Sequence, residues 1–195
     1  ASTGINEAVE KRDGGSEYLG LGVKNAVESV QEIANAIKDL DVFDQTRIDQ
    51  TMVDLDGTKN KSRLGANAIL GVSLGVAHAA AEHRNVPLFK YVAELYGNEH
   101  PNLLPTPMMN VINGGVHAKN GLPFQEFMVV PTGARSFSEA MRMGSEVYGT
   151  LGKITASSGV GDEGGFSPNS FKSNGGAGKI RDALTLLSQG IEKAG

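Results

Sequence analysis

The sequence predicts an α/β protein of two domains, residues 1–104 and 105–195, both expected to be incomplete. Apolar residues recur at three-and-four spacing through the first hundred residues, which is typical of helices. Pro101, Pro105 and Pro107 then interrupt any helix and indicate a domain boundary. Beyond them, short apolar runs alternate with helical patterns, as they do at the start of an α/β barrel.

The first domain is expected to contain four helices. Apolar spacing places them at residues 23–37, 44–53, 66–82 and 88–96. The third is rich in Ala and apolar nearly all round, a pattern that is typical of a buried helix. The turn Asp56-Gly57-Thr58 separates it from the second helix.

The second domain is expected to open with two buried strands, residues 108–112 and 127–130, because these short apolar runs are bounded by Gly and Pro. Residues 113–121 between them are too rich in Gly for a regular element. Ser136 and Glu139 have the spacing of a capping box and predict a helix reaching Leu151. A Gly-rich loop, 159–174, precedes a last helix from about Lys179.

Composition excludes several classes of protein. The 22 acidic and 18 basic residues are scattered, so no nucleic-acid partner is expected. Cysteine is absent, which excludes disulfides and thiolate metal sites. No window approaches the roughly 18 apolar residues of a membrane span, and no signal-peptide layout is present, so a soluble cytoplasmic protein is expected. Ala1 replaces an initiator Met, and we expect the natural chain to start earlier.

One motif points to a dinucleotide, but its context argues against that reading. Residues 159–164 satisfy the G-x-G-x-x-G pattern. That pattern requires a helix directly after the glycines, whereas Phe166-Ser167-Pro168-Asn169 follows, and Asp162 and Glu163 would repel phosphate. We therefore reject a dehydrogenase-type site.

Three acids and one histidine remain as candidate functional residues. Asp162 and Glu163 lie in Gly-rich sequence, and Glu126 stands at the mouth of an apolar strand, where burial would raise its pKa. Two carboxyl groups on neighbouring barrel strands or loops would form an acid–base site, although such acids are by default solvated loop charges. His117 could be a lid residue, a metal ligand or a polar loop side chain, and its loop composition favours the last.

Several motifs, in order and at matching spacing along the whole chain, resemble the enolase family: Ala1-Ser2-Thr3-Gly4, Leu55-Asp56-Gly57-Thr58, Lys61-Ser62-Arg63-Leu64-Gly65, Asn113-Gly114-Gly115 with His117-Ala118, Gln125-Glu126-Phe127-Met128, and Gly161-Asp162-Glu163-Gly164-Gly165. The resemblance implies part of an N-terminal α+β domain without its opening strands, followed by the first part of an enolase-type barrel. It also implies less than half of a full-length enzyme.

The resemblance implies a function as well: magnesium-dependent dehydration of 2-phosphoglycerate to phosphoenolpyruvate by a homodimer. Position by position, Ser2 matches a mobile-loop ligand of the second Mg²⁺, and His117 matches a loop residue near the substrate. Glu163 matches the acid that helps the C3 hydroxyl depart, and Glu126 the carboxylate that supports it and the substrate. The lysine base and the first Mg²⁺ carboxylates are expected beyond residue 195, so the chain alone should be inactive.

Two departures and one rival function accompany this resemblance. Residues 149–160 are shorter and richer in Gly than is usual, which should weaken the helix before Glu163, and Pro123 and residues 174–178 are unusual too. A role as a surface-displayed binding protein is the rival, with a surface lysine motif as the feature to seek.

Overall fold

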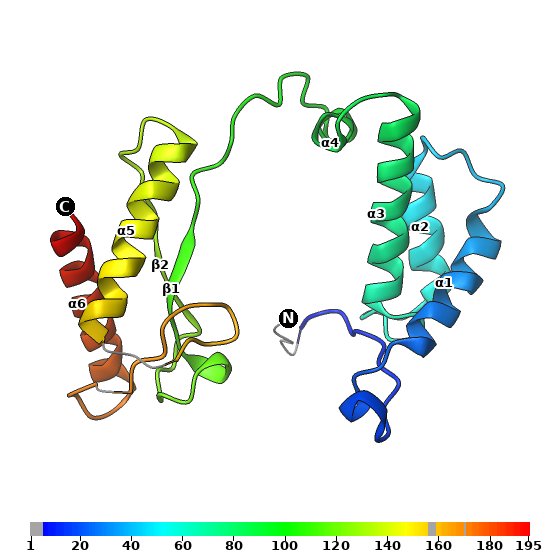
Figure 1. Cartoon of the computed structure of the whole chain (residues 1–195). Helices are drawn as coiled ribbons and strands as arrows, with labels where there is room; N and C mark the ends of the chain where they lie inside the picture. Colours follow the sequence, from blue (N-terminus) through cyan, green and yellow to red (C-terminus); the bar gives the residue numbers. More distant parts are fainter. Residues whose placement is uncertain (1–5, 156–158, 170) are drawn as a thin grey trace. The chain divides into compact units, whose positions relative to one another are not determined.

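The structure is a computed structural model that describes residues 6–155, 159–169 and 171–195 (Figure 1). It divides into two compact units, Ala1–Asn102 and Leu103–Gly195. The boundary expected between residues 104 and 105 falls beside that division. Each unit has its own hydrophobic core, and each is considered separately here.

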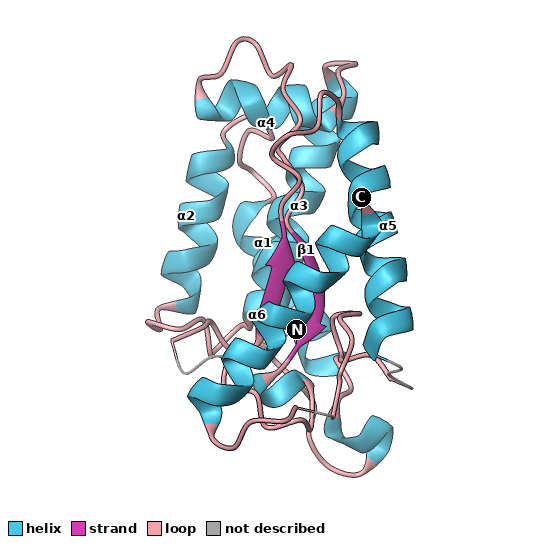
Figure 2. Cartoon of the chain, turned by 90° about the vertical axis from the view of Figure 1, so that its left-hand side faces the viewer, coloured by secondary structure: helices cyan, strands magenta, loops and turns pink. Residues whose placement is uncertain are grey.

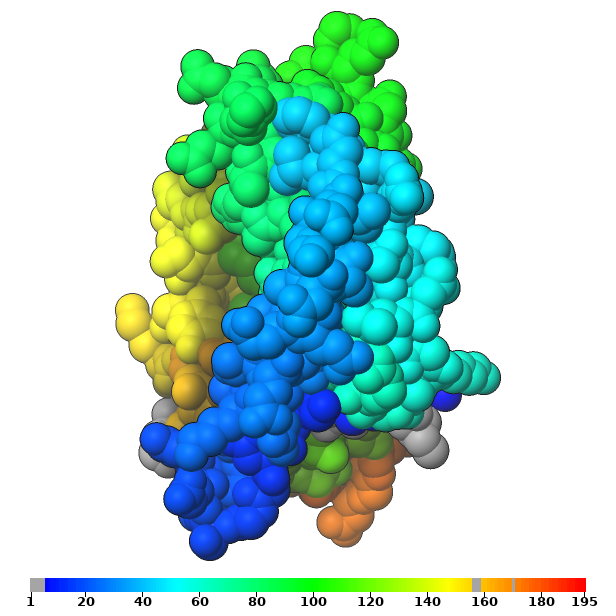
Figure 3. Space-filling model, turned by 90° about the vertical axis from the view of Figure 1, so that its right-hand side faces the viewer, coloured from blue at the N-terminus to red at the C-terminus, as the bar shows by residue number. Residues whose placement is uncertain are grey.

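The described part of the first unit is helical, as the apolar spacing predicts. After a 3₁₀ turn, η1 (Glu17–Gly20), come α1 (Lys24–Ile37), α2 (Gln45–Asp56), α3 (Ala66–His83) and α4 (Leu88–Tyr96). Helix α2 runs to Asp56, three residues past its expected end, because Gly57 adopts the left-handed conformation that ends it. Helices α1 and α2 pack side by side, visible in Figure 3 as neighbouring blue and cyan surfaces.

Helix α3 is the centre of this unit, but it is not buried all round as expected. Helices α1, α2 and α4 all pack against it. Within the first unit, no described element covers its remaining side, where Leu70 and Leu74 are 58% and 51% exposed. An apolar sequence indicates a surface that can be buried, whereas the neighbours decide whether it is.

The loop between α2 and α3 is organised by one buried carboxylate. Asp56 accepts hydrogen bonds from the backbone N–H of Leu64 at 2.7 Å and of Thr58 at 2.9 Å, and also from the Thr58 hydroxyl. Burial raises the pKa of Asp56, but these hydrogen bonds outweigh burial, and the net pKa lies below the ordinary aspartate value. The carboxylate thereby holds Leu64 in the core that it shares with Ile33 and Met52.

Replacing Asp56 by Asn should therefore destabilise the chain by about 1–3 kcal/mol, since an amide turned toward the Leu64 N–H leaves a buried donor unpaired. Urea unfolding of the chain measures this. The stabilisation is present above the ordinary aspartate pKa and is lost as the pH falls through the lowered pKa of the folded state. The difference in the free energy of unfolding between wild type and variant should therefore shrink in acid. Asp54→Asn, an exposed change on the same helix, is the control. Equal stability of the two variants would contradict the role given to Asp56.

The second unit is built on a pair of antiparallel strands, drawn in magenta in Figure 2. They are β1 (Met109–Asn113) and β2 (Glu126–Val129), each shifted by one residue from its expected bounds. The residues between them form a 3₁₀ turn, η2 (Gly115–His117), where no regular element was expected. Phe166 lies along the other edge of β1, with its N–H donated to Val111 O at 2.9 Å.

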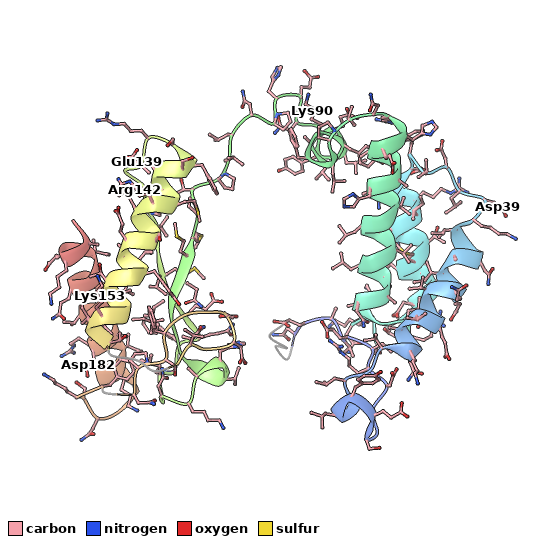
Figure 4. All side chains as sticks on the ribbon, in the orientation of Figure 1. Asp39, Lys90, Glu139, Arg142, Lys153 and Asp182 are labelled. Carbon is pink, nitrogen blue, oxygen red and sulfur yellow. The ribbon has the colours of Figure 1, made fainter. Side chains whose placement is uncertain are left out.

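Two helices complete this core. Helix α5 (Phe137–Thr155) begins at the predicted cap, where Ser136 Oγ accepts from the N–H of Glu139 at 3.1 Å. Figure 4 labels Glu139 and Arg142 in its first turns. Helix α6 (Gly176–Ala194) packs against α5, and both contribute to the core with the strands: Val111, Ile112, Phe127, Val147, Leu151, Ala183 and Leu187.

Both helices extend beyond their expected bounds through segments that are rich in Gly. Helix α5 continues through Gly149 and Gly152 to Thr155, and a Cβ on Gly152 would come within 3.0 Å of the Phe166 ring. Helix α6 begins at Gly176, three residues before Lys179, because its first turn packs closely on Ser173, whose N–H and hydroxyl bind Asp182 (Figure 4). Small residues here allow close packing, an advantage that offsets their low helix propensity.

Candidate active site

Two carboxyl groups meet at the carboxyl end of β1. Asn113, the last residue of β1, pairs across the sheet with Glu126, the first residue of β2. The loop that carries Glu163 returns to the other edge of β1, where Asn113 donates its N–H to Phe166 O at 3.0 Å. Glu126 and Glu163 consequently share a hydrogen bond between their side chains. In Figure 1 this region is the lower end of the strands, where the orange loop lies beside η2.

The Glu163 side chain is held by three amide donors and is 28% exposed. Its Oε2 accepts from Asn113 Nδ2 at 2.9 Å and from Asn110 Nδ2 at 3.2 Å. Its Oε1 accepts from Gln125 Nε2 at 3.1 Å. Such a set of donors favours the ionised carboxylate, because neutral amide N–H groups stabilise negative charge without neutralising it.

The two carboxyl groups have opposite pKa shifts. The hydrogen bond to Glu163 raises the pKa of Glu126, and burial and the negative charge of Glu163 raise it further. Burial raises the pKa of Glu163, but hydrogen bonds from Glu126, Asn113 and Gln125 outweigh it, so this pKa is lowered overall. Of the two groups, Glu126 therefore has the higher affinity for a proton that the pair shares, and Glu163 has the lower one.

These directions confirm one expectation and refine another. The sequence predicted a raised pKa for Glu126 through burial, and the direction is confirmed although a neighbouring carboxylate is the main cause. The resemblance implied that Glu163 is the proton donor, and of the two carboxyl groups Glu163 is the one whose pKa is lowered. The physical reason is the unequal supply of amide donors to the two groups.

His117 lies beside the pair and is not a solvated loop residue. Its side chain is only 7% exposed, with Nε2 3.7 Å from Glu163 Oε1 and Nδ1 3.7 Å from Asp162 Oδ2. Both distances exceed a hydrogen bond, and neither ring nitrogen has a hydrogen-bond partner among the described residues. The ring is held by the η2 turn, in which the His117 N–H donates to Gly114 O at 3.1 Å. Burial leaves both ring nitrogens unsatisfied by the described residues.

The structure thus brings together His117, Glu126 and Glu163, three of the five candidate residues. Ser2 lies outside the described residues. Asp162 borders the site but its side chain is 83% exposed. Sequence reasoning missed the amide donors Asn110, Asn113 and Gln125. Two of them, Asn113 and Gln125, belong to motifs quoted above, but no local pattern reveals that their amides converge on one carboxylate far along the chain.

The loop geometry also argues against dinucleotide binding. Gly161 and Gly164 form a turn in which the Gly164 N–H donates to Gly161 O at 3.0 Å. No helix opens within residues 165–169, and α6 begins only at Gly176. The helix N-terminus that would face a pyrophosphate is therefore not next to these glycines.

The described residues do not fit a metal ion. In the ranges 6–155, 159–169 and 171–195, no three His, Asp or Glu side chains gather at metal-binding distances. The oxygens of Glu163 already face amide N–H groups, which would compete with a cation for the same lone pairs. The pair is an acid–base arrangement, and no step through a metal is derived from it.

The second unit places its two carboxyl groups at the carboxyl end of β1, the end of a strand at which α/β-barrel enzymes carry their active-site residues. Comparison with known families gives the particular one. Residues 1–92 match the family described as "Enolase, N-terminal domain", and residues 101–195 match "Enolase, C-terminal TIM barrel domain". The chain belongs to the enolase family, which is a family of lyase-type enzymes.

None of the described helices is both long enough and apolar enough to cross a membrane.

Proposed function

We propose that the chain is part of a magnesium-dependent enolase that reversibly dehydrates 2-phospho-D-glycerate to phosphoenolpyruvate. The observation that supports this best is the Glu126–Glu163 pair beside the His117 ring, whose nitrogens have no hydrogen-bond partner among the described residues. We propose that the pair carries one transferable proton. Dehydration needs such a proton, because hydroxide is a poor leaving group and departs readily only as water. Family membership supplies the substrate class.

In this proposal Glu163 delivers the proton and Glu126 stores it. After the C2 proton has been removed, the bond from C3 to its hydroxyl oxygen breaks with its electron pair on oxygen. That oxygen takes a proton from Glu163 and leaves as water, while the C2 electron pair forms the double bond. The hydrogen bond between the two carboxyl groups lets the proton of Glu126 pass to Glu163 beforehand.

The His117 ring and the amides have positioning roles in the same step. His117 can donate to the substrate's phosphate or hydroxyl, since its ring nitrogens are free of protein hydrogen bonds among the described residues. The amides of Asn110 and Gln125 hold the Glu163 carboxylate in place. Because these amides already hold the carboxylate in position, little reorientation of polar groups is needed during the reaction, whereas water molecules would have to reorient.

Magnesium belongs to the proposal for the whole enzyme. Bound Mg²⁺ stabilises the extra negative charge that forms next to the substrate carboxylate. We propose that Ser2 reaches the second Mg²⁺ when its loop closes, and that the lysine base and the first-Mg²⁺ carboxylates lie outside residues 1–195. A cytoplasmic homodimer completes the proposal.

The purified 195-residue chain should therefore produce no phosphoenolpyruvate from 2-phosphoglycerate with Mg²⁺ present, while the full-length protein should. The enol product absorbs in the ultraviolet, so one assay follows both proteins. The chain has an acid pair, but it lacks the proposed lysine base and the proposed Mg²⁺ carboxylates. Catalytic groups that act together lose most of their effect when one of them is missing. Clear turnover by the chain would overturn its proposed incompleteness, and an inactive full-length protein would overturn the proposed reaction.

A further inference from the structure

Asn113 is fully buried, and every polar atom of its side chain has a partner. Nδ2 donates to Glu163 Oε2 at 2.9 Å and to Gln125 O at 3.3 Å, and Oδ1 accepts the Gly165 N–H at 2.9 Å. Its carbonyl oxygen accepts from Asn120 Nδ2 at 2.9 Å. The Asn113 side chain therefore connects the loop that carries Glu163 to Gln125, the residue before β2. The Asn113 backbone connects to Asn120, in the loop that carries His117.

The space around this amide is closed. A Cβ on Gly161 would come within 2.6 Å of Asn113 Cβ, and one on Gly165 within 2.8 Å of Asn113 Oδ1. Glycines at both positions let the Glu163 loop lie directly on the amide. Only a side chain of the same size fits here without displacing that loop.

We propose that Asn113 is a positioning residue that keeps Glu163 as the ionised, proton-accepting member of the pair and leaves the proton on Glu126. Its place in catalysis rests on the proposed function, whereas the proton distribution is a property of the folded chain. The orientation of the amide is set by its other contacts: the Gly165 N–H must meet Oδ1, which turns Nδ2 toward Glu163.

The surrounding charges do not produce this distribution by themselves. Glu126 and Glu163 face each other, so their repulsion is mutual and favours neither as the proton carrier. Beside Glu163 lie His117 from η2 and the exposed Asp162 from its own loop, whose effects oppose each other when the ring is protonated. The asymmetry comes from the amides, which the hydrogen bonds place on Glu163.

The test is a carboxyl titration of the 195-residue chain by carbon NMR, compared with Asn113→Asp. Aspartate is isosteric and keeps an oxygen for the Gly165 N–H, but it removes the donor to Glu163 and adds a negative charge beside it. We expect Glu163 to titrate below Glu126 in the wild type. In the variant the titration midpoint of Glu163 should move upward. The gap between the Glu163 and Glu126 midpoints should then narrow, or the order of the two midpoints should reverse.

Asn120→Asp is the matched control, because it adds the same charge nearby without touching Glu163. Its Glu163 midpoint should move less than in Asn113→Asp. Equal shifts in the two variants would overturn the inference, since charge alone would then explain the result.

A measurement on the wild-type chain covers the case in which a variant does not fold. The side-chain amide resonances of Asn113 should shift with the midpoint of Glu163 and not with that of Glu126. Amide resonances that ignore the Glu163 titration, or a Glu126 midpoint below that of Glu163, would refute the inference. This test needs no turnover, so it is independent of the proposed reaction. If the full-length protein proves inactive while Glu163 still titrates below Glu126, the result supports this inference and counts against the proposed reaction.

Discussion

Replacing Glu163 by Gln in the full-length enzyme is expected to lower turnover by about 10²–10⁴-fold, the usual contribution of general acid catalysis. An amide cannot give a proton to departing hydroxide, and it cannot take part in the proton transfer from Glu126 that we propose. The KM for 2-phosphoglycerate should change less, because the group acts mainly on the departing hydroxyl. The rate of enol formation at saturating substrate, with Mg²⁺ present, measures the effect.

The neighbouring acid provides the control for this substitution. Asp162 lies in the same loop with its side chain 83% exposed, so Asp162→Asn should change turnover far less. The glutamine at position 163 retains an oxygen that can accept from Asn113, and its stability should stay near that of the wild type. A fully active Glu163→Gln enzyme would remove this residue from the acid role. If both variants lost the same amount of turnover, the cause would be the lost negative charge of the loop and not the acid role of Glu163.

Replacing Leu151 by Ala is expected to cost about 2–5 kcal/mol of stability, the range seen when a fully buried Leu is truncated. Leu151 is completely buried between α5 and α6, in the core that also contains Val111 and Phe127. Close packing leaves little room for neighbours to fill the cavity. Urea unfolding of the 195-residue chain gives the value, and Leu184→Ala, at an exposed position on α6, should cost much less.

A second substitution tests where that packing occurs. Gly190 of α6 lies so close that a Cβ there would come within 2.6 Å of Leu151 Cδ2. Gly190→Ala alone should therefore be destabilising through overpacking, typically by about 1–3 kcal/mol. In the Leu151→Ala background the same change should cost less, since the new methyl group enters the vacated space. Additive effects in this double-mutant cycle would contradict direct contact between the two residues.

The helices show what local sequence can determine. Helix α4 occupies the predicted residues, Leu88–Tyr96, and α1 and α3 match within a residue at each end. A helix forms between residues three and four apart, so its pattern and its cap are written in adjacent sequence. The capping interaction of Ser136 was predictable for the same reason. Glycine misled the prediction at the start of α6, where Gly178 packs closely on Ser173 and a Cβ on Gly176 would come within 3.3 Å of the Pro123 ring.

The site shows the opposite case. Residue types and spacing were enough to select Glu126, Glu163 and His117 as candidates and to indicate the enolase family. The structure adds the contact between the two carboxyl groups and the burial of the His117 ring, and it leaves Ser2 outside the described residues.

What the sequence by itself determined is therefore the family, the helices and the identity of most candidate groups, since these depend on residue type and short-range order. Only the tertiary structure decided which of the two carboxyl groups has the raised pKa and which helices pack against α3. Proton affinity depends on the donors and charges within a few ångströms of each oxygen. For Glu163 those donors include Asn110 and Asn113, about 50 residues away along the chain, and only folding brings them to its oxygens.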